Sequence, residues 1–169
     1  SGTATLVFRY IVASGHTSAD LAYVSSTAFA LTGSNTKIQD NLVNDGVLTF
    51  PAPGANNSLK ANKALVIDTE APTAGTVNDG SGTDVAYSSS STSLTANWTG
   101  FSDALSGISG YKIAIGTTSG GTEVLTWTNV GNVTTYTKTD LTLNQYTAYY
   151  ISTRAQDAAG NYSSIATAN

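Results

Sequence analysis

A strict alternation of apolar and polar residues is the feature that most constrains this chain. It runs along residues 4–12 and returns at residues 94–98 and 149–155. Because successive side chains of a strand point to opposite faces, a period of two predicts β-strands and argues against helices. Clusters of turn-forming residues separate these runs about every ten residues, which is typical of β-sandwiches. The predicted fold class is therefore all-β.

The composition supports this fold class and excludes several functions. Charged residues make up only 11% of the chain, against about 25% in an ordinary soluble protein, so good helix formers are scarce. The net charge is −4 and the seven basic residues are scattered singly, so we expect no nucleic-acid partner. The chain has no cysteine, which excludes disulfides and thiolate catalysis. No apolar run reaches the length of about 20 residues that a membrane span needs.

A stiff linker at Asp68–Thr73 predicts two domains. Pro72 has no amide hydrogen to give to a strand ladder and restricts the residue before it to extended conformations, so we place the domains at residues 1–69 and 70–169. The first domain offers about four or five strands, whereas a sandwich of this kind has about seven in about 100 residues. Its strand candidates are residues 4–12, 20–31, 47–50 and 64–67.

The missing strands of the first domain have two explanations. Residues upstream of Ser1 would complete the sandwich if this chain is a fragment of a longer protein. Alternatively, a neighbouring chain supplies the missing strands, as in donor-strand polymers. A head-to-tail arrangement of such copies would build a filament. Either explanation would cover the unpaired edge and exposed core that an incomplete sandwich leaves.

Several features of the second half occur together and in order. Trp98 ends an alternating strand, the segments FSD (101–103) and SGI (106–108) lead into Tyr111, and Leu143 lies six residues before Tyr149. The sequence RAQDAAGN (154–161) follows. In this combination, residues 72–169 resemble a fibronectin type III-like domain of bacterial secreted and surface proteins. The resemblance implies a complete β-sandwich in which Leu143 and Tyr149 close a corner.

The first half contains Thr5–Val12, then Asp20–Tyr23, then Ile38–Asp40 before a turn, and finally Leu65–Pro72. With these segments, residues 1–69 resemble the C-terminal part of an immunoglobulin-like repeat of large bacterial adhesins. The opening strands of that repeat are absent here. The two resemblances together imply tandem immunoglobulin-like β-sandwiches, the first of them incomplete, in an extracellular bacterial protein.

Oxygen-bearing side chains are expected to converge beside the linker. In the fibronectin type III-like fold, the loops between strands B and C and between strands F and G lie at the pole nearest the preceding domain. Carboxylate and amide oxygens are the hard ligands that Ca²⁺ prefers, and an ion there would stiffen the joint between the domains. The expected ligands are Asp68, Glu70, Asp103, Asp157 and Asn161. The alternative is that each Asp caps its own turn and that Glu70 is solvated.

A second calcium site is a further hypothesis for the first domain. Asp20, Asp40 and Asp45 are its candidate ligands, since all three lie in turn-like contexts. Turn capping is again the alternative for each of them.

The aromatic residues divide into core and surface candidates. Trp98 and Tyr111 lie on inward faces of the expected strands, and Tyr149 is expected to satisfy its hydroxyl through the corner hydrogen bond. The alternation leaves Lys112 facing outward. The less constrained aromatics are Trp127, Tyr136, Tyr146, Tyr150 and Tyr162. Among them, Trp127 and Tyr150 are the candidates for a carbohydrate-binding strip, with ordinary scattered surface aromatics as the alternative.

The sequence contains no recognisable arrangement of catalytic groups. His16 is the only histidine and lies in a turn between Gly15 and Thr17. The chain has no nucleophile elbow, zinc-protease motif or phosphate-binding loop. We therefore predict that the protein is not an enzyme.

Taken together, these features favour a structural or adhesive spacer module of a bacterial cell-surface or secreted protein, with Ca²⁺ between its domains. The expected partners are neighbouring domains of the same protein and a glycan or host-cell surface, with no nucleic acid and no membrane span. Two other functions stay open. One is an accessory carbohydrate-binding or linker module of a secreted polysaccharide-degrading enzyme. The other is a self-assembling extracellular filament subunit completed by strand donation.

Overall fold

The computed structural model of this chain describes residues 7–33 and 37–168. It divides into two units, Ser1–Asp68 and Thr69–Asn169, and each is described by itself. Residues 4–6, which begin the first predicted strand and include Thr5 and Leu6 of the adhesin-like pattern, lie outside the described residues.

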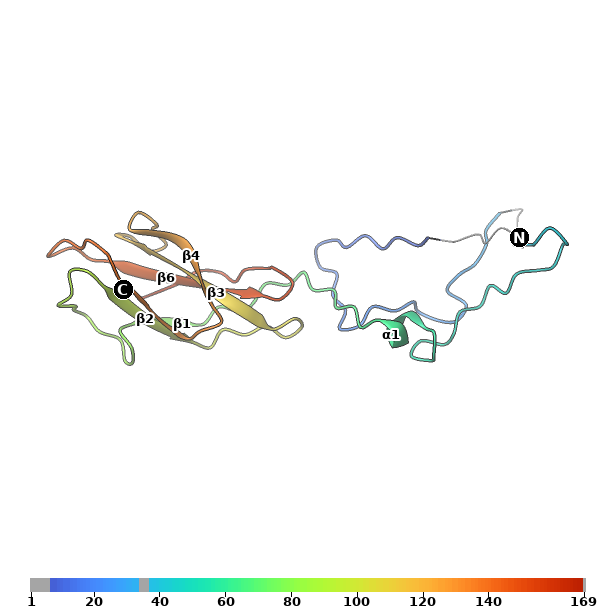
Figure 1. Cartoon of the computed structure of the whole chain (residues 1–169), viewed down its shortest axis with the longest axis horizontal. Helices are drawn as coiled ribbons and strands as arrows, with labels where there is room; N and C mark the ends of the chain where they lie inside the picture. Colours follow the sequence, from blue (N-terminus) through green and yellow to red (C-terminus); the bar gives the residue numbers. More distant parts are fainter. Residues whose placement is uncertain (1–6, 34–36, 169) are drawn as a thin grey trace. The chain divides into compact units, whose positions relative to one another are not determined.

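The described part of the second unit is a sandwich of two antiparallel sheets (Figure 1). The strand order is β1-β2-β5 in one sheet and β4-β3-β6-β7 in the other. The first sheet comprises β1 (Thr76–Asp79), β2 (Leu94–Thr99) and β5 (Thr135–Lys138). The second comprises β3 (Ile108–Gly116), β4 (Leu125–Gly131), β6 (Tyr150–Asp157) and β7 (Ala166–Ala168). This topology confirms the predicted all-β sandwich and is that of immunoglobulin-like and fibronectin type III-like domains.

The alternating residues supply the core between the two sheets. Trp98 on β2 is 2% exposed, and its ring centroid lies 5.4 Å from that of Tyr111 on β3. Phe101 packs edge-on against Tyr111, with ring centroids 5.5 Å apart. The prediction that Trp98 and Tyr111 point inward is confirmed, and such large rings contribute much of the stability of a small core. The other buried members of the core are Val77, Ala96, Ile113, Ile115, Leu141, Ile151, Ala155 and Ala168.

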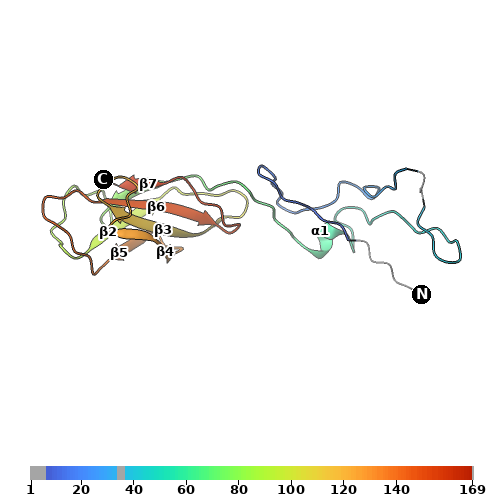
Figure 2. The same ribbon diagram turned by 90° about the horizontal axis from the view of Figure 1, so that it is seen from above.

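The long pairing of β3 with β6 fixes which residues share the outer face of the second sheet. The two strands lie side by side from Ile108 opposite Asp157 to Gly116 opposite Tyr150 (Figure 2). Ile113 is directed into the core, so its neighbour Lys112 and the residue opposite Lys112, Arg154, face outward. The predicted outward orientation of Lys112 is thus confirmed.

A tyrosine closes the corner before β6. The backbone N–H of Asn144 donates a hydrogen bond of 2.8 Å to the hydroxyl of Tyr149. Leu143 packs against the core, and its backbone N–H donates to the carbonyl oxygen of Ser91. The predicted roles of Leu143 and Tyr149 are therefore confirmed.

The first unit has a very different local structure. Over residues 7–33 and 37–68 it contains no strand, only the short helix α1 (Leu59–Asn62) and isolated bridges such as Ser18↔Ile67 (Figure 1). The strands predicted at residues 20–31, 47–50 and 64–67, and at the described residues 7–12 of the first predicted strand, are therefore wrong as ladder-forming strands. In the described part of the chain, no helix is long and apolar enough to cross a membrane.

The extended segments of the first unit lack a partner over most of their length. A strand is stable only when a neighbour accepts and donates its backbone hydrogen bonds, and here single bonds such as Phe50 N–H to Ser26 O replace a ladder. The side chains of Val7, Val24 and Val47 are 87%, 92% and 87% exposed. The main apolar contacts are among Phe8, Tyr23, Phe29 and Phe50, with ring centroids 4.9–6.1 Å apart.

Asp79 ends β1 with a half-buried carboxyl group. Within the described residues its buried Oδ1 has no hydrogen-bond partner, while its backbone N–H donates to Oδ1 of Asp84 at 2.9 Å. Burial, and secondarily the charge of Asp84, raise the pKa of Asp79 to about 6. Because this pKa lies above that of the unfolded chain, ionisation of Asp79 disfavours the folded state.

We predict that Asp79→Asn raises the melting temperature of the second unit by about 5 °C at pH 7.5 and leaves it unchanged at pH 3.5. The stability that the protonated carboxyl provides is complete below a pH of about 4 and is lost as the pH rises through about 6. The uncharged amide avoids that loss. Thermal unfolding across this pH range is the measurement. Asp140→Asn, which removes a carboxylate from an exposed turn, is the control, and an equal gain at both pH values would contradict the assignment.

Candidate functional site

Asp157 organises the turn that follows β6. Its side chain is only 1% exposed. Oδ1 accepts hydrogen bonds from the backbone N–H groups of Gly160 and Asn161 at 2.6 and 2.8 Å, and Oδ2 accepts from Nδ2 of Asn161 at 2.8 Å. Gly160 adopts a φ of 101°, a conformation that side chains rarely tolerate. The buried carboxylate is thus held by three donors from the turn that it closes.

Asp103 plays the same part in the loop between β2 and β3. Its Oδ1 accepts hydrogen bonds from three successive backbone N–H groups, those of Leu105, Ser106 and Gly107, at 3.1, 2.8 and 2.8 Å. Charged acceptors of this kind form stronger hydrogen bonds than neutral ones. The turn-capping alternative is confirmed for both Asp103 and Asp157.

The two capped loops are joined to each other. The backbone N–H of Ala158 donates to the carbonyl oxygen of Gly107 at 3.0 Å. The hydroxyl of Ser109 donates to the carbonyl oxygen of Asp157 at 2.7 Å. The linker is tied to the same loops, because Thr73 and Ser102 form an isolated bridge. These bonds fix the positions from which Asp103 and Asp157 extend their carboxylates.

Two of the expected calcium ligands come close together within the second unit. Asp103 and Asp157 each offer one carboxylate oxygen, and these atoms lie within 4.8 Å of each other. Two oxygens bound to the same Ca²⁺ at 2.3–2.6 Å are at most about 5 Å apart, so this spacing is compatible with one shared ion. Asn161 adjoins the group through its bonds to Asp157. Glu70 is exposed and is not a member of the group.

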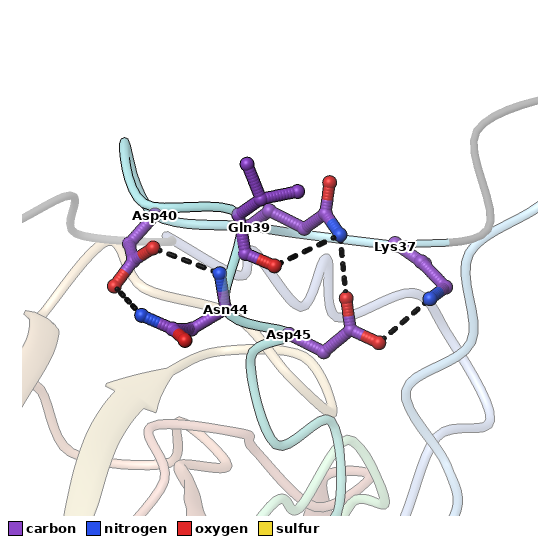
Figure 3. A network of polar contacts seen from close by, with 6 residues as sticks. Lys37, Gln39, Asp40, Asn44 and Asp45 are labelled. Atoms are coloured by element: carbon purple, nitrogen blue, oxygen red, sulfur yellow. Dashed lines mark hydrogen bonds and ion pairs between the residues drawn. The ribbon is translucent and has the colours of Figure 1, made fainter.

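The structure does not support the second calcium hypothesis, which concerns the first unit. Within residues 7–33 and 37–168, Asp20, Asp40 and Asp45 do not converge on a common point. Asp45 instead accepts from Lys37 Nζ and Gln39 Nε2, both at 2.7 Å (Figure 3). The Lys37 hydrogen bond is the main cause of the lowered pKa of Asp45.

Asp40 closes the same loop from its other side. Its Oδ1 accepts from the backbone N–H of Asn44 and its Oδ2 from Nδ2 of Asn44, both at 2.9 Å (Figure 3). These bonds lower the pKa of Asp40. The second calcium site is therefore a wrong prediction, since Asp40 and Asp45 are engaged in turn capping and ion pairing.

The two carbohydrate candidates lie on the second sheet in different surroundings. Trp127 on β4 has the guanidinium of Arg154 over its ring, with Cζ 4.5 Å from the ring centroid. Tyr150 begins β6 and lines an open groove with Tyr87, Tyr146 and Tyr149. The sequence analysis missed Arg154, whose guanidinium also lies over the ring of Tyr162, one of the less constrained aromatics. The outward alternation of β6 was the available signal for Arg154, but nothing in the sequence indicates its aromatic neighbours.

Comparison with known proteins gives little independent support. No family model matches the chain, and no curated protein matches it. A solved structure described as a Fn3-like protein from Clostridium thermocellum is 23% identical over 58% of this chain and 88% of that chain, with a TM-score of 0.32. The fold assignment of the second unit follows from its own strand order and core.

Proposed function

We propose that this chain is a structural spacer module of a bacterial cell-surface or secreted protein, and that Ca²⁺ bound by Asp68, Asp103 and Asp157 stiffens its linker. The proximity of the Asp103 and Asp157 carboxylate oxygens, within 4.8 Å of each other beside the linker, is the observation that supports the proposal. A spacer transmits position and force, so a linker fixed to the loops of the following sandwich suits that role.

The loops are prepared for an ion in two ways. Backbone N–H groups orient the carboxylates of Asp103 and Asp157, as outer-shell hydrogen bonds orient the ligands of known metal sites. The two like charges of Asp103 and Asp157 also repel each other at this spacing, and a divalent cation would turn that repulsion into attraction. Asn161, backbone carbonyls and water would complete the six to eight oxygens that Ca²⁺ takes.

The extracellular location is part of the same proposal. Calcium sites of extracellular modules bind in the range of about 10⁻⁴–10⁻³ M, which such a partly preformed group can reach. The scarcity of charged residues and the wealth of strand and turn formers are compatible with an exported β-protein.

We predict that 5 mM CaCl₂ raises the melting temperature of the second unit by about 5–10 °C over the value in EGTA. An ion with a dissociation constant of about 10⁻⁴–10⁻³ M adds about 1–2 kcal/mol at that concentration, and each kcal/mol shifts the melting temperature of a domain this size by about 4–8 °C. Differential scanning calorimetry measures the shift.

Two variants separate binding from loop structure. Asp103→Asn keeps an Oδ1 acceptor for the loop amides but removes the charge, so we expect a melting temperature in EGTA close to that of the original chain and a much smaller calcium shift. Asp45→Asn, in the ion pair with Lys37, is the control and should leave the calcium shift intact. A calcium shift that is absent, or that Asp103→Asn retains in full, would rule out the proposed ion.

A second candidate function is self-assembly, in which the first unit accepts a strand from a second copy of this chain. The observation that favours it is the exposure of Val7 and Val47 on segments that form no ladder within residues 7–33 and 37–68, and of Val24 in the bend that follows Tyr23. A donated strand would pair with those segments and cover their apolar side chains.

Self-assembly predicts a mass that increases with concentration. Light scattering after size-exclusion chromatography at about 10 and 200 μM should show oligomers of the full chain at the higher value. Val24→Lys should reduce them, whereas Thr49→Lys, at an exposed polar position, should not. A single monomeric mass at both concentrations would refute strand donation and leave the calcium proposal untouched.

A further inference from the structure

Arg154 lies against two aromatic rings on the outer face of the four-stranded sheet. Its Cζ is 4.5 Å from the ring centroid of Trp127 on β4 and 4.3 Å from that of Tyr162, which follows β6. The bridge between Tyr162 and Gln156 holds the second ring beside the strand. Contacts of this kind fix a guanidinium in place while leaving its in-plane N–H groups for a ligand.

A second cation stands directly beside the first. Lys112 on β3 is the register partner of Arg154, and its Nζ lies 5.0 Å from the centroid of the Tyr162 ring. Like charges opposite each other on neighbouring strands destabilise a sheet. Among the described residues, neither cation takes part in an ion pair, and Nε of Arg154 is buried without a hydrogen-bond partner.

The charge of this face differs from that of the chain as a whole. The net charge is −4, yet β3, β4 and β6 contain no acidic residue except Asp157, which is 1% exposed. Asn129, opposite Lys112 on β4, adds a neutral amide. This face thus carries two aromatic rings, two cations without acidic partners and an amide.

We infer that this face binds an acidic saccharide, a sugar ring that carries a carboxylate or a sulfate group. The planar guanidinium of Arg154 would bind the anionic group with two parallel hydrogen bonds, and Lys112 would add a point charge. The apolar face of the sugar ring would lie against the partly exposed rings of Trp127 and Tyr162, and Asn129 would bond a hydroxyl. This inference is independent of the spacer role and adds a ligand to it.

Saccharide binding is tested on the full chain in EGTA, so that calcium cannot bridge protein and ligand. The probes are trigalacturonic acid, a sulfated galactose trimer, uncharged galactotriose, a hexaglutamate peptide and sodium sulfate at matched ionic strength. Quenching of tryptophan fluorescence reports binding at Trp127, since Trp98 is 2% exposed. We expect at least one of the two acidic sugars to bind at least about tenfold more tightly than each of the three other probes. Which of them it is identifies the anionic group.

Three variants place the ligand on this face. Arg154→Met keeps an apolar stem between the rings but removes the charge, and it should weaken binding at least about tenfold. Arg154→Lys keeps the charge without the planar fork and should give an intermediate loss. Lys138→Met, on β5 of the opposite sheet, is the control and should bind as the original chain does. Near-UV circular dichroism of the core aromatics checks that each variant is folded.

The remaining outcomes overturn the inference. Equal binding of galactotriose would remove the role of the anion, and equal binding of sodium sulfate would remove the role of the sugar. Equal binding of hexaglutamate would assign the face to acidic peptides. No binding of either acidic sugar at about 10 mM, or undiminished binding by folded Arg154→Met, would show that the stack of Trp127, Arg154 and Tyr162 only stabilises the sheet.

Discussion

The buried carboxylate of Asp157 is the constraint on which the loops at one end of the sandwich depend. Removing an ionised carboxylate from water costs several kcal/mol unless hydrogen bonds or a cation replace the lost hydration. Three donors from the following turn do so in part, which forces residues 158–161 into one conformation. The same pole holds Asp103 in a matching arrangement. These bonds leave the carboxylates of Asp103 and Asp157 with oxygens within 4.8 Å of each other at one end of the sandwich.

The contrast between the two units shows what an alternating sequence does and does not determine. In the second unit, the alternation of β2, β3 and β6 finds partner strands, and the inward residues meet around Trp98 and Tyr111. In the first unit, residues with an equally regular pattern remain extended without a ladder over the described range. Alternation specifies which side chains share a face, but strand pairing also needs a neighbour, and the pattern of one segment does not supply it.

In the candidate sites too, the sequence predicts what depends on one segment but not what depends on pairing between segments. Local hydrogen bonds can be predicted from the sequence. An Asp before a Gly-containing turn predicts capping, which Asp103 and Asp157 perform, and Tyr149 six residues after Leu143 predicts the corner bond. Contacts between distant strands cannot be predicted in this way. Trp127 and Arg154 meet because of the registers on either side of β3, and the bridge between Gln156 and Tyr162 adds the second ring. The prediction that pairs Trp127 with Tyr150 therefore rests on residue type alone, and the sequence gives no reason to place Asp103 and Asp157 together without Glu70.

Residue-resolved NMR of the full chain tests most directly whether the carboxylates of Asp103 and Asp157 share a calcium ion. The backbone amides that donate to these two carboxylates are those of Leu105, Ser106, Gly107, Gly160 and Asn161. If the carboxylates share an ion, adding CaCl₂ to about 5 mM shifts the ¹⁵N–¹H signals of these amides along saturable curves with one common dissociation constant. The amides of Leu42 and Asn44, which donate to Asp40, should stay in place. Unchanged signals at residues 105–107 and 160–161, or equal shifts at residues 42 and 44, would contradict it.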